Sequence, residues 1–147
     1  MTPTKISPRH PRAESLRIRE RLVEQFGSGV VAAAGLLAHG RGEAFDYLLG
    51  EETRPNAHKA IETAAVLLLT AERPVISVNG NATVLAAKDM VKLAQLINAK
   101  IEVNLFHRSL DREKAIEKLL RNAGAASVLG VGDASSATIP EIASDRR

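Results

Sequence analysis

Apolar positions in the first part of the chain recur with a helical period. Leu16, Ile18, Leu22, Val23 and Phe26 are spaced as on one side of a helix, which predicts a helix over residues 15–26. Residues 1–11 contain three prolines and are predicted to form an extended arm before it. Residues 30–42 are apolar, small and interrupted by glycine, so helix and strand are both consistent with them.

Two further helices are expected before the pattern changes. Residues 43–49 are predicted to form a short helix that stops at Gly50, and residues 56–71, rich in Ala and Leu, a longer one. These segments make the first half of the chain a helical region.

From Pro74 onward, short β-branched runs alternate with helical segments. Residues 75–78 (Val-Ile-Ser-Val) predict a strand, followed by an Asn-Gly-Asn turn and a helix that ends near Asn98. Residues 101–106 and 127–131 repeat the strand, and residues 111–122 repeat the helix. This alternation predicts an α/β fold, with right-handed crossovers and a doubly wound parallel sheet covered on both faces.

The predicted sheet looks incomplete at its C-terminal side. Residues 132–147 contain no amphipathic helix, and a three-stranded parallel sheet with open edges would be small for this architecture. We therefore expect either a fragment of a longer protein or a layer supplied by a partner. Residues 12–147 are predicted to form one α/β domain, truncated at its C-terminus, with a helical part over 12–72 and βα units over 74–147.

Composition excludes several classes of protein. With 147 residues, 45% hydrophobic and 25% charged, the chain is typical of a globular domain, and the absence of cysteine excludes disulfides and thiol chemistry. Twenty Lys and Arg against 17 Asp and Glu give a net charge of only +3, and the few aromatic residues form no stacking run, so nucleic acid is not expected. No apolar run reaches the roughly 18 residues of a membrane span, and no signal sequence opens the chain, which predicts a cytoplasmic protein.

Two arginines in the helical region are candidate anion ligands. Gly40 and Gly42 flank Arg41 just before a predicted helix, where glycine lets the backbone approach a phosphate and arginine offers a bidentate charge. A tight turn with an exposed Arg41 is the alternative. Arg19 lies near the apolar stripe of the first helix, and a partly buried arginine needs an anionic partner.

Polar residues also follow two of the predicted strands. Asn79 and Asn81 come directly after the first strand, and His107 and Arg108 after the second, so all four are expected around one crevice at the carboxyl edge of the sheet. The alternatives are an Asn-Gly turn that needs positive φ and ordinary surface residues. The sequence predicts no metal site, because the four histidines lack ligand spacing, and the Gly130–Gly132 motif lacks the third glycine and the helix of a dinucleotide site.

Longer segments of the sequence closely resemble a known family, the archaeal phosphopantothenate synthetases, which are 4-phosphopantoate–β-alanine ligases of coenzyme A biosynthesis. The resemblance extends from about Pro8 to the last residues and is most specific in the block around Arg41. The segments that carry it are residues 10–16, 18–20, 35–50, 75–81 and 102–106.

The resemblance implies an ATP-dependent ligase that forms an acyl-adenylate of 4-phosphopantoate, releases diphosphate and then joins the acyl group to β-alanine. It implies a homodimer with a Rossmann-like fold, with Mg²⁺ expected on the triphosphate. By the same resemblance Arg19 and Arg41 bind ATP, and Asn79, Asn81 and the His107-Arg108 segment contribute to the phosphopantoate pocket.

Some alternatives stay open at this point. His39 and His107 are both candidates for the base that accepts a proton from β-alanine. Family members usually have an aromatic residue in place of Ala13, and they continue well beyond 147 residues. A noncatalytic anion- or nucleotide-binding domain is the alternative function, and a nicotinamide-dependent oxidoreductase is disfavoured by the failed dinucleotide motif.

Overall fold

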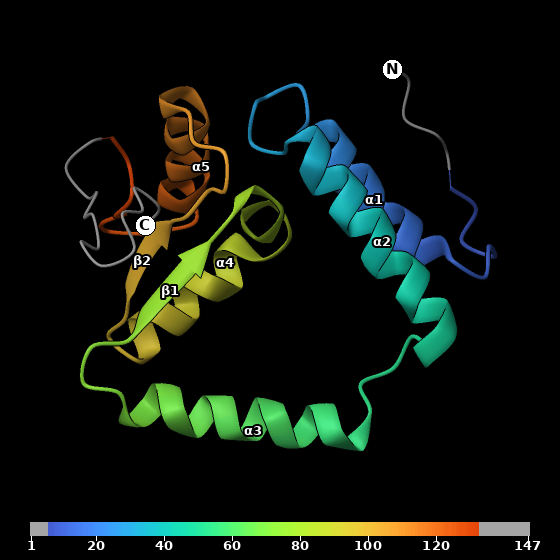
Figure 1. The fold of residues 1–147 in the computed structure, drawn as a ribbon, viewed down its shortest axis with the longest axis horizontal. Helices are drawn as coiled ribbons and strands as arrows, with labels where there is room; N and C mark the ends of the chain where they lie inside the picture. Colours follow the sequence, from blue (N-terminus) through green and yellow to red (C-terminus); the bar gives the residue numbers. More distant parts are fainter. Residues whose placement is uncertain (1–5, 133–147) are drawn as a thin grey trace, which may run out of the picture.

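The computed structural model describes residues 6–132, which form five α-helices and two β-strands (Figure 1). In chain order these are α1 (Ala13–Glu24), α2 (Ala33–Leu49), α3 (Pro55–Thr70), β1 (Val75–Val78), α4 (Gly80–Leu96), β2 (Lys100–Val103) and α5 (Leu110–Asn122). The α/β class and most of these elements agree with the sequence pattern to within a few residues. The Rossmann-like topology and the single-domain boundaries stay predictions.

The two strands form a parallel sheet in which Val75 pairs with Lys100 and Val78 with Val103. The predicted third strand over residues 127–131 is wrong in extent, because only Leu129 forms a bridge, opposite Glu102. The N–H of Val103 donates to the backbone oxygen of Leu129, and the N–H of Leu129 donates to that of Ile101, each at 2.8 Å. Gly130 and Gly132 have positive φ values of 77° and 72°, which end the extended conformation directly after this bridge.

The described residues cover one face of this sheet, not both as predicted. α4 and α5 pack against each other and against β2, so both helices lie on the same side. Val78, Ile101 and Val103 point to that side and are buried, whereas Val75 and Lys100 are exposed. The strands follow one another in a single direction from β1 through β2 to Leu129, and right-handed crossovers then place both helices on one face.

The hydrophobic core lies between this covered face and the helices. Leu22 of α1, Ile116 and Leu120 of α5 are fully buried, at 0% exposure. Burial of each such side chain contributes about 1.5–3 kcal/mol to the free energy of folding. Val30 and Val31, from the loop between α1 and α2, complete the core next to β1.

The segment that the sequence left undecided, residues 30–42, is helical from Ala33 onward. α2 runs without a break through Gly40, Arg41 and Gly42, so the predicted glycine loop before a separate short helix is wrong. Gly50, with φ of 89°, ends the helix as predicted. The described part of the N-terminal arm, residues 6–11, forms turns instead of running extended.

Two helices have unusual surroundings. α3 connects the end of α2 to β1 and lies apart from the other elements in Figure 1; none of its residues is buried. α4 is kinked at Ala86, where φ is −140°, and the guanidinium of Arg21 donates to the backbone oxygens of Val84 (2.9 Å) and Leu85 (3.1 Å) at this break. Arg21 therefore fastens α1 to the kink.

Candidate functional site

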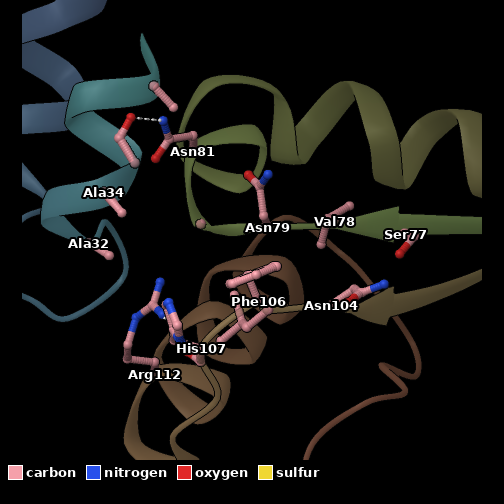
Figure 2. Close-up of a pocket in the computed structure, with 14 residues that line it drawn as sticks. Ala32, Ala34, Ser77, Val78, Asn79, Asn81, Asn104, Phe106, His107 and Arg112 are labelled. Carbon is pink, nitrogen blue, oxygen red and sulfur yellow. Dashed lines mark hydrogen bonds between the residues drawn. The ribbon is translucent and has the colours of Figure 1, made fainter. Parts of the chain in front are cut away.

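A pocket of about 520 Å³ opens at the carboxyl ends of β1 and β2 (Figure 2). Its walls come from the start of α2, the ends of both strands, the start of α4 and the first turn of α5. The lining residues are Ala32, Ala34, Gly35, Ala38, Ser77, Val78, Asn79, Gly80, Asn81, Asn104, Leu105, Phe106, His107 and Arg112. This is the edge where open parallel sheets place their ligands.

Asn79 lies between the end of β1 and the start of α4. Its side-chain oxygen accepts a hydrogen bond from the backbone N–H of Ala82 (2.9 Å), which caps the helix, and its backbone oxygen accepts one from the hydroxyl of buried Thr83 (2.9 Å). The cap uses the amide oxygen of Asn79 and holds the residue at the pocket wall.

Gly80 is required by a close backbone contact, not by positive φ. It is the first residue of α4 and is not among the glycines with positive φ, so the turn interpretation of the Asn-Gly pair is wrong. A Cβ atom built at this position would lie 1.9 Å from the backbone oxygen of Val30. Glycine therefore allows the loop before α2 to pack directly against the start of α4.

Asn81 fastens α4 to α2. Its side-chain nitrogen donates to the backbone oxygen of Gly35 at 2.8 Å, the one hydrogen bond drawn in Figure 2. A Cβ atom at Gly35 would lie 2.5 Å from the side-chain oxygen of Asn81, so glycine gives this contact its room. The two helix starts are thus held on the same side of the pocket.

The opposite wall follows β2. The backbone N–H of Asn104 donates to the backbone oxygen of Val78 (2.8 Å), which extends the pairing of the strands by one step. The rings of Phe106 and His107 then meet edge to face, with centroids 4.8 Å apart. Asn79, Asn81 and His107 therefore surround one pocket, as expected from their strand ends, and their roles as ligands or base stay predictions.

Sequence reasoning missed Arg112, which lies in the first turn of α5. Its guanidinium donates to three backbone oxygens, those of Gly29 (3.1 Å), Val30 (3.4 Å) and His107 (3.0 Å). The available signal was a basic residue in the first turn of a helix that follows a parallel strand, where the helix dipole favours acidic residues.

The neighbouring Arg108 does not line this pocket. Its side chain pairs with Glu113 at 2.6 Å and donates to the backbone oxygen of Gly132 at 3.3 Å. Glu113 is only 2% exposed, and its second carboxylate oxygen accepts from the N–H of Gly132 (2.8 Å). This network anchors the turn after Leu129, and the predicted contact of Arg108 with substrate stays a prediction.

Arg19 and Arg41 lie outside this pocket as well. Both are exposed on α1 and α2, so the expectation that Arg19 is partly buried is wrong. α1 and α2 lie side by side in Figure 1, and a smaller hollow of about 300 Å³ is lined by residues of both helices, among them His39 and Asp46. His39 and His107 therefore belong to different cavities, and the imidazole Nε2 of His39 is buried without a hydrogen-bond partner.

The electrostatics of the pocket at the strand ends favour an anion. Among the described residues that line it, none is acidic, whereas Arg112 and His107 are basic. The start of α2 also faces it, where Ala32 offers no side chain to cap the free N–H groups. Uncapped helix N-termini and arginine are both suited to phosphate or carboxylate.

Two other kinds of site are absent from the described part of the chain. Residues 6–132 bring together no group of three or more acidic or histidine side chains suited to a metal ion. No helix in this range combines the length and hydrophobicity that a membrane span requires.

Comparison with known proteins points to one family. A sequence model of the phosphopantothenate/pantothenate synthetase family matches residues 56–147. This match includes β1, β2 and the starts of α4 and α5, which together supply most of the pocket.

Curated archaeal proteins are similar over most of the chain. The 4-phosphopantoate–beta-alanine ligase of Methanospirillum hungatei is 54% identical over 121 residues, which are 82% of this chain and 50% of that protein. The ligase of the same name from Thermococcus onnurineus is 53% identical over 80% of this chain and 45% of its own length. That of Methanosarcina mazei is 46% identical over 98% of this chain and 56% of its own. The chain thus spans about half the length of these relatives.

Proposed function

Because the chain belongs to the phosphopantothenate/pantothenate synthetase family, we propose that it forms part of an ATP-dependent ligase. The reaction joins 4-phosphopantoate to β-alanine and gives 4′-phosphopantothenate, AMP and diphosphate, a step of coenzyme A biosynthesis in the cytoplasm. The observation that carries the proposal is the identity of about half of all aligned residues to ligases of this name, over 80% and 82% of the chain.

The proposed reaction has two balanced steps. A carboxylate oxygen of 4-phosphopantoate attacks the α-phosphorus of ATP, and diphosphate leaves. The nitrogen of β-alanine then attacks the acyl carbon, AMP leaves, and the nitrogen gives up a proton to a base. The anionic substrates and ATP repel one another, so their approach requires fixed positive groups.

The residues around the pocket suit 4-phosphopantoate. The amide side chains of Asn81 and Asn104 can orient its hydroxyl and carbonyl oxygens, and the starts of α2 and α4 present backbone N–H groups. His107 lines the same pocket and is the better placed candidate base, whereas His39 lies in the hollow between α1 and α2.

ATP is proposed to bind over α1 and α2, where the exposed side chains of Arg19 and Arg41 are available to its phosphates. No described residue lining the pocket at the strand ends has a carboxylate, so the residues there do not form a Mg²⁺ site. Mg²⁺ would instead arrive bound to the triphosphate, as part of the substrate.

We also propose that the protein works as a homodimer. α3 exposes a run of large apolar side chains, with Ile61 at 59%, Leu67 at 64% and Leu69 at 70% exposure. A surface of this kind is typical of an interface. Sedimentation velocity should show a dimer that Leu67→Glu dissociates, and a wild-type monomer over the micromolar range would contradict the proposal.

Release of AMP tests the proposed function. The product of the complete reading frame is incubated with ATP, 4-phosphopantoate and β-alanine, and AMP is quantified by chromatography. We expect AMP in equal amount to 4′-phosphopantothenate, and none when 4-phosphopantoate is omitted. Binding of 4-phosphopantoate without AMP release would instead support a noncatalytic anion-binding domain.

A further inference from the structure

The pocket holds an arginine whose charge has no acidic counterpart. Arg112 forms no ion pair with any described residue, in contrast to Arg12, Arg17, Arg108 and Arg121. Its side chain is partly buried, and all its hydrogen bonds go to neutral backbone oxygens. A partly buried cation without a carboxylate partner is costly unless an anion completes it.

Arg112 is also held in a fixed position. Three of its five N–H groups donate to Gly29, Val30 and His107, from the loop before α2 and the segment after β2. The two remaining N–H groups belong to the terminal nitrogens, and Figure 2 shows the guanidinium beside the pocket, next to His107. A guanidinium group that is already held in place loses little side-chain entropy when it binds an oxyanion.

We propose that Arg112 binds the phosphate of the phosphorylated substrate and sets the preference of this pocket for a phosphorylated acid. The inference rests on the proposed function and deepens it. The carboxylate of the same substrate has to reach ATP, so the non-reacting phosphate is the group that can remain on a fixed arginine. The start of α2, at Ala34 and Gly35, faces the same space and suits the double negative charge.

Arg112 takes this role in preference to Arg108. The charge of Arg108 is already balanced by buried Glu113 at 2.6 Å, and its side chain reaches Gly132, away from the lining residues. The two arginines are four residues apart in the sequence, yet only Arg112 combines a place in the pocket with an unbalanced charge.

Titration calorimetry on the same protein as in the AMP assay tests the inference, with 4-phosphopantoate, pantoate and inorganic phosphate as ligands. Arg112→Gln should weaken binding of 4-phosphopantoate at least about tenfold and leave the weak binding of pantoate unchanged. Arg121→Gln is the matched control, because Arg121 lies at the other end of α5 and also donates to a backbone oxygen, that of Ala126. The affinity of Arg121→Gln for 4-phosphopantoate should stay within about twofold of wild type.

A second pair of variants changes the charge of the pocket and leaves the hydrogen bonds of Arg112 in place. Ala34 is exposed in the first turn of α2 and lines the pocket, so Ala34→Glu adds a negative charge there and Ala34→Gln a neutral side chain of the same size. Glu in this turn favours the helix, so both variants should fold. We expect Ala34→Glu to bind 4-phosphopantoate several-fold more weakly than Ala34→Gln, with a smaller difference at high salt.

The outcomes separate the inference from the proposed function. Folded Arg112→Gln with wild-type affinity, equal affinities of the two Ala34 variants, or a wild-type chain that binds none of the three ligands would each overturn the role of Arg112. If one of these three results is found and AMP is still released, the ligase function stands and the role of Arg112 falls. If phosphate binds in an Arg112-dependent way but no AMP is released, the anion site stands and the ligase function fails.

Discussion

Replacement of Gly80 by alanine should destabilise the protein, although alanine is the better helix former. In an open helical position this change stabilises by about 0.5–1 kcal/mol. At Gly80 the new Cβ atom would lie 1.9 Å from the backbone oxygen of Val30 and 2.9 Å from its carbonyl carbon. Both neighbouring atoms belong to the backbone, so no side-chain rotation can relieve the contact.

The size of the effect follows from the displacement that is needed. Cβ atoms do not approach other heavy atoms closer than 3.0 Å, so the loop must move by at least 3.0 − 1.9 = 1.1 Å. Val30 and Val31 are each only 2% exposed, and this shift disturbs the core beside β1. Overpacking of this kind costs about 1–3 kcal/mol, which outweighs the gain in helix propensity.

Urea unfolding followed by circular dichroism measures the change, with Gly40→Ala as the matched control. Gly40 lies inside α2 with no atom within 4 Å of a built Cβ, so this variant should be more stable than wild type by about 0.5–1 kcal/mol. The two glycine variants should therefore shift the urea midpoint in opposite directions. A Gly80→Ala variant as stable as wild type would refute the argument from close approach.

Three further substitutions test the core, the ion pair of buried Glu113 and the kink in α4. Leu120→Ala should lower the free energy of unfolding by about 2–5 kcal/mol, whereas Leu96→Ala, at a 73% exposed position, should change it by less than about 0.5 kcal/mol; equal urea midpoints would contradict the placement of the core. Glu113→Gln replaces the buried carboxylate that accepts from Arg108 and from the N–H of Gly132 and should cost about 1–3 kcal/mol in thermal unfolding, and an unchanged melting temperature would argue against a stabilising role of this carboxylate. Arg21→Met removes two hydrogen bonds at the break in α4 and should speed amide exchange around Ala86, an effect that exchange rates equal to wild type would exclude.

The pocket shows how far strand ends alone can locate a site. Parallel strands end at one edge of the sheet, so the sequence alone predicts Asn79, Asn81 and His107 around one crevice, and all three line the pocket. The direction in which a charged side chain points is not set by this rule. Arg108 turns to Glu113, and Arg112 reaches the pocket, because each side chain follows the partners that the fold brings within reach.

Local sequence was enough to predict the properties that depend on neighbouring residues. Hydrophobic period and helix stops located α1, α3, β1, α4, β2 and α5 to within a few residues, and their alternation indicated parallel strands. Of α2 only the last part, residues 43–49, and its stop at Gly50 were predicted, because the apolar and small residues before them show no clear period.

Features that join distant segments could not be predicted, because they arise when the chain packs in three dimensions. The need for glycine at position 80 comes from Val30, fifty residues earlier in the sequence, and the third strand is reduced to one bridge at Leu129 by the turn that Glu113 and Arg108 hold. Arg112 becomes part of the pocket because the loop before α2 offers it two backbone oxygens. Such contacts depend on packing in space, which local propensity does not encode.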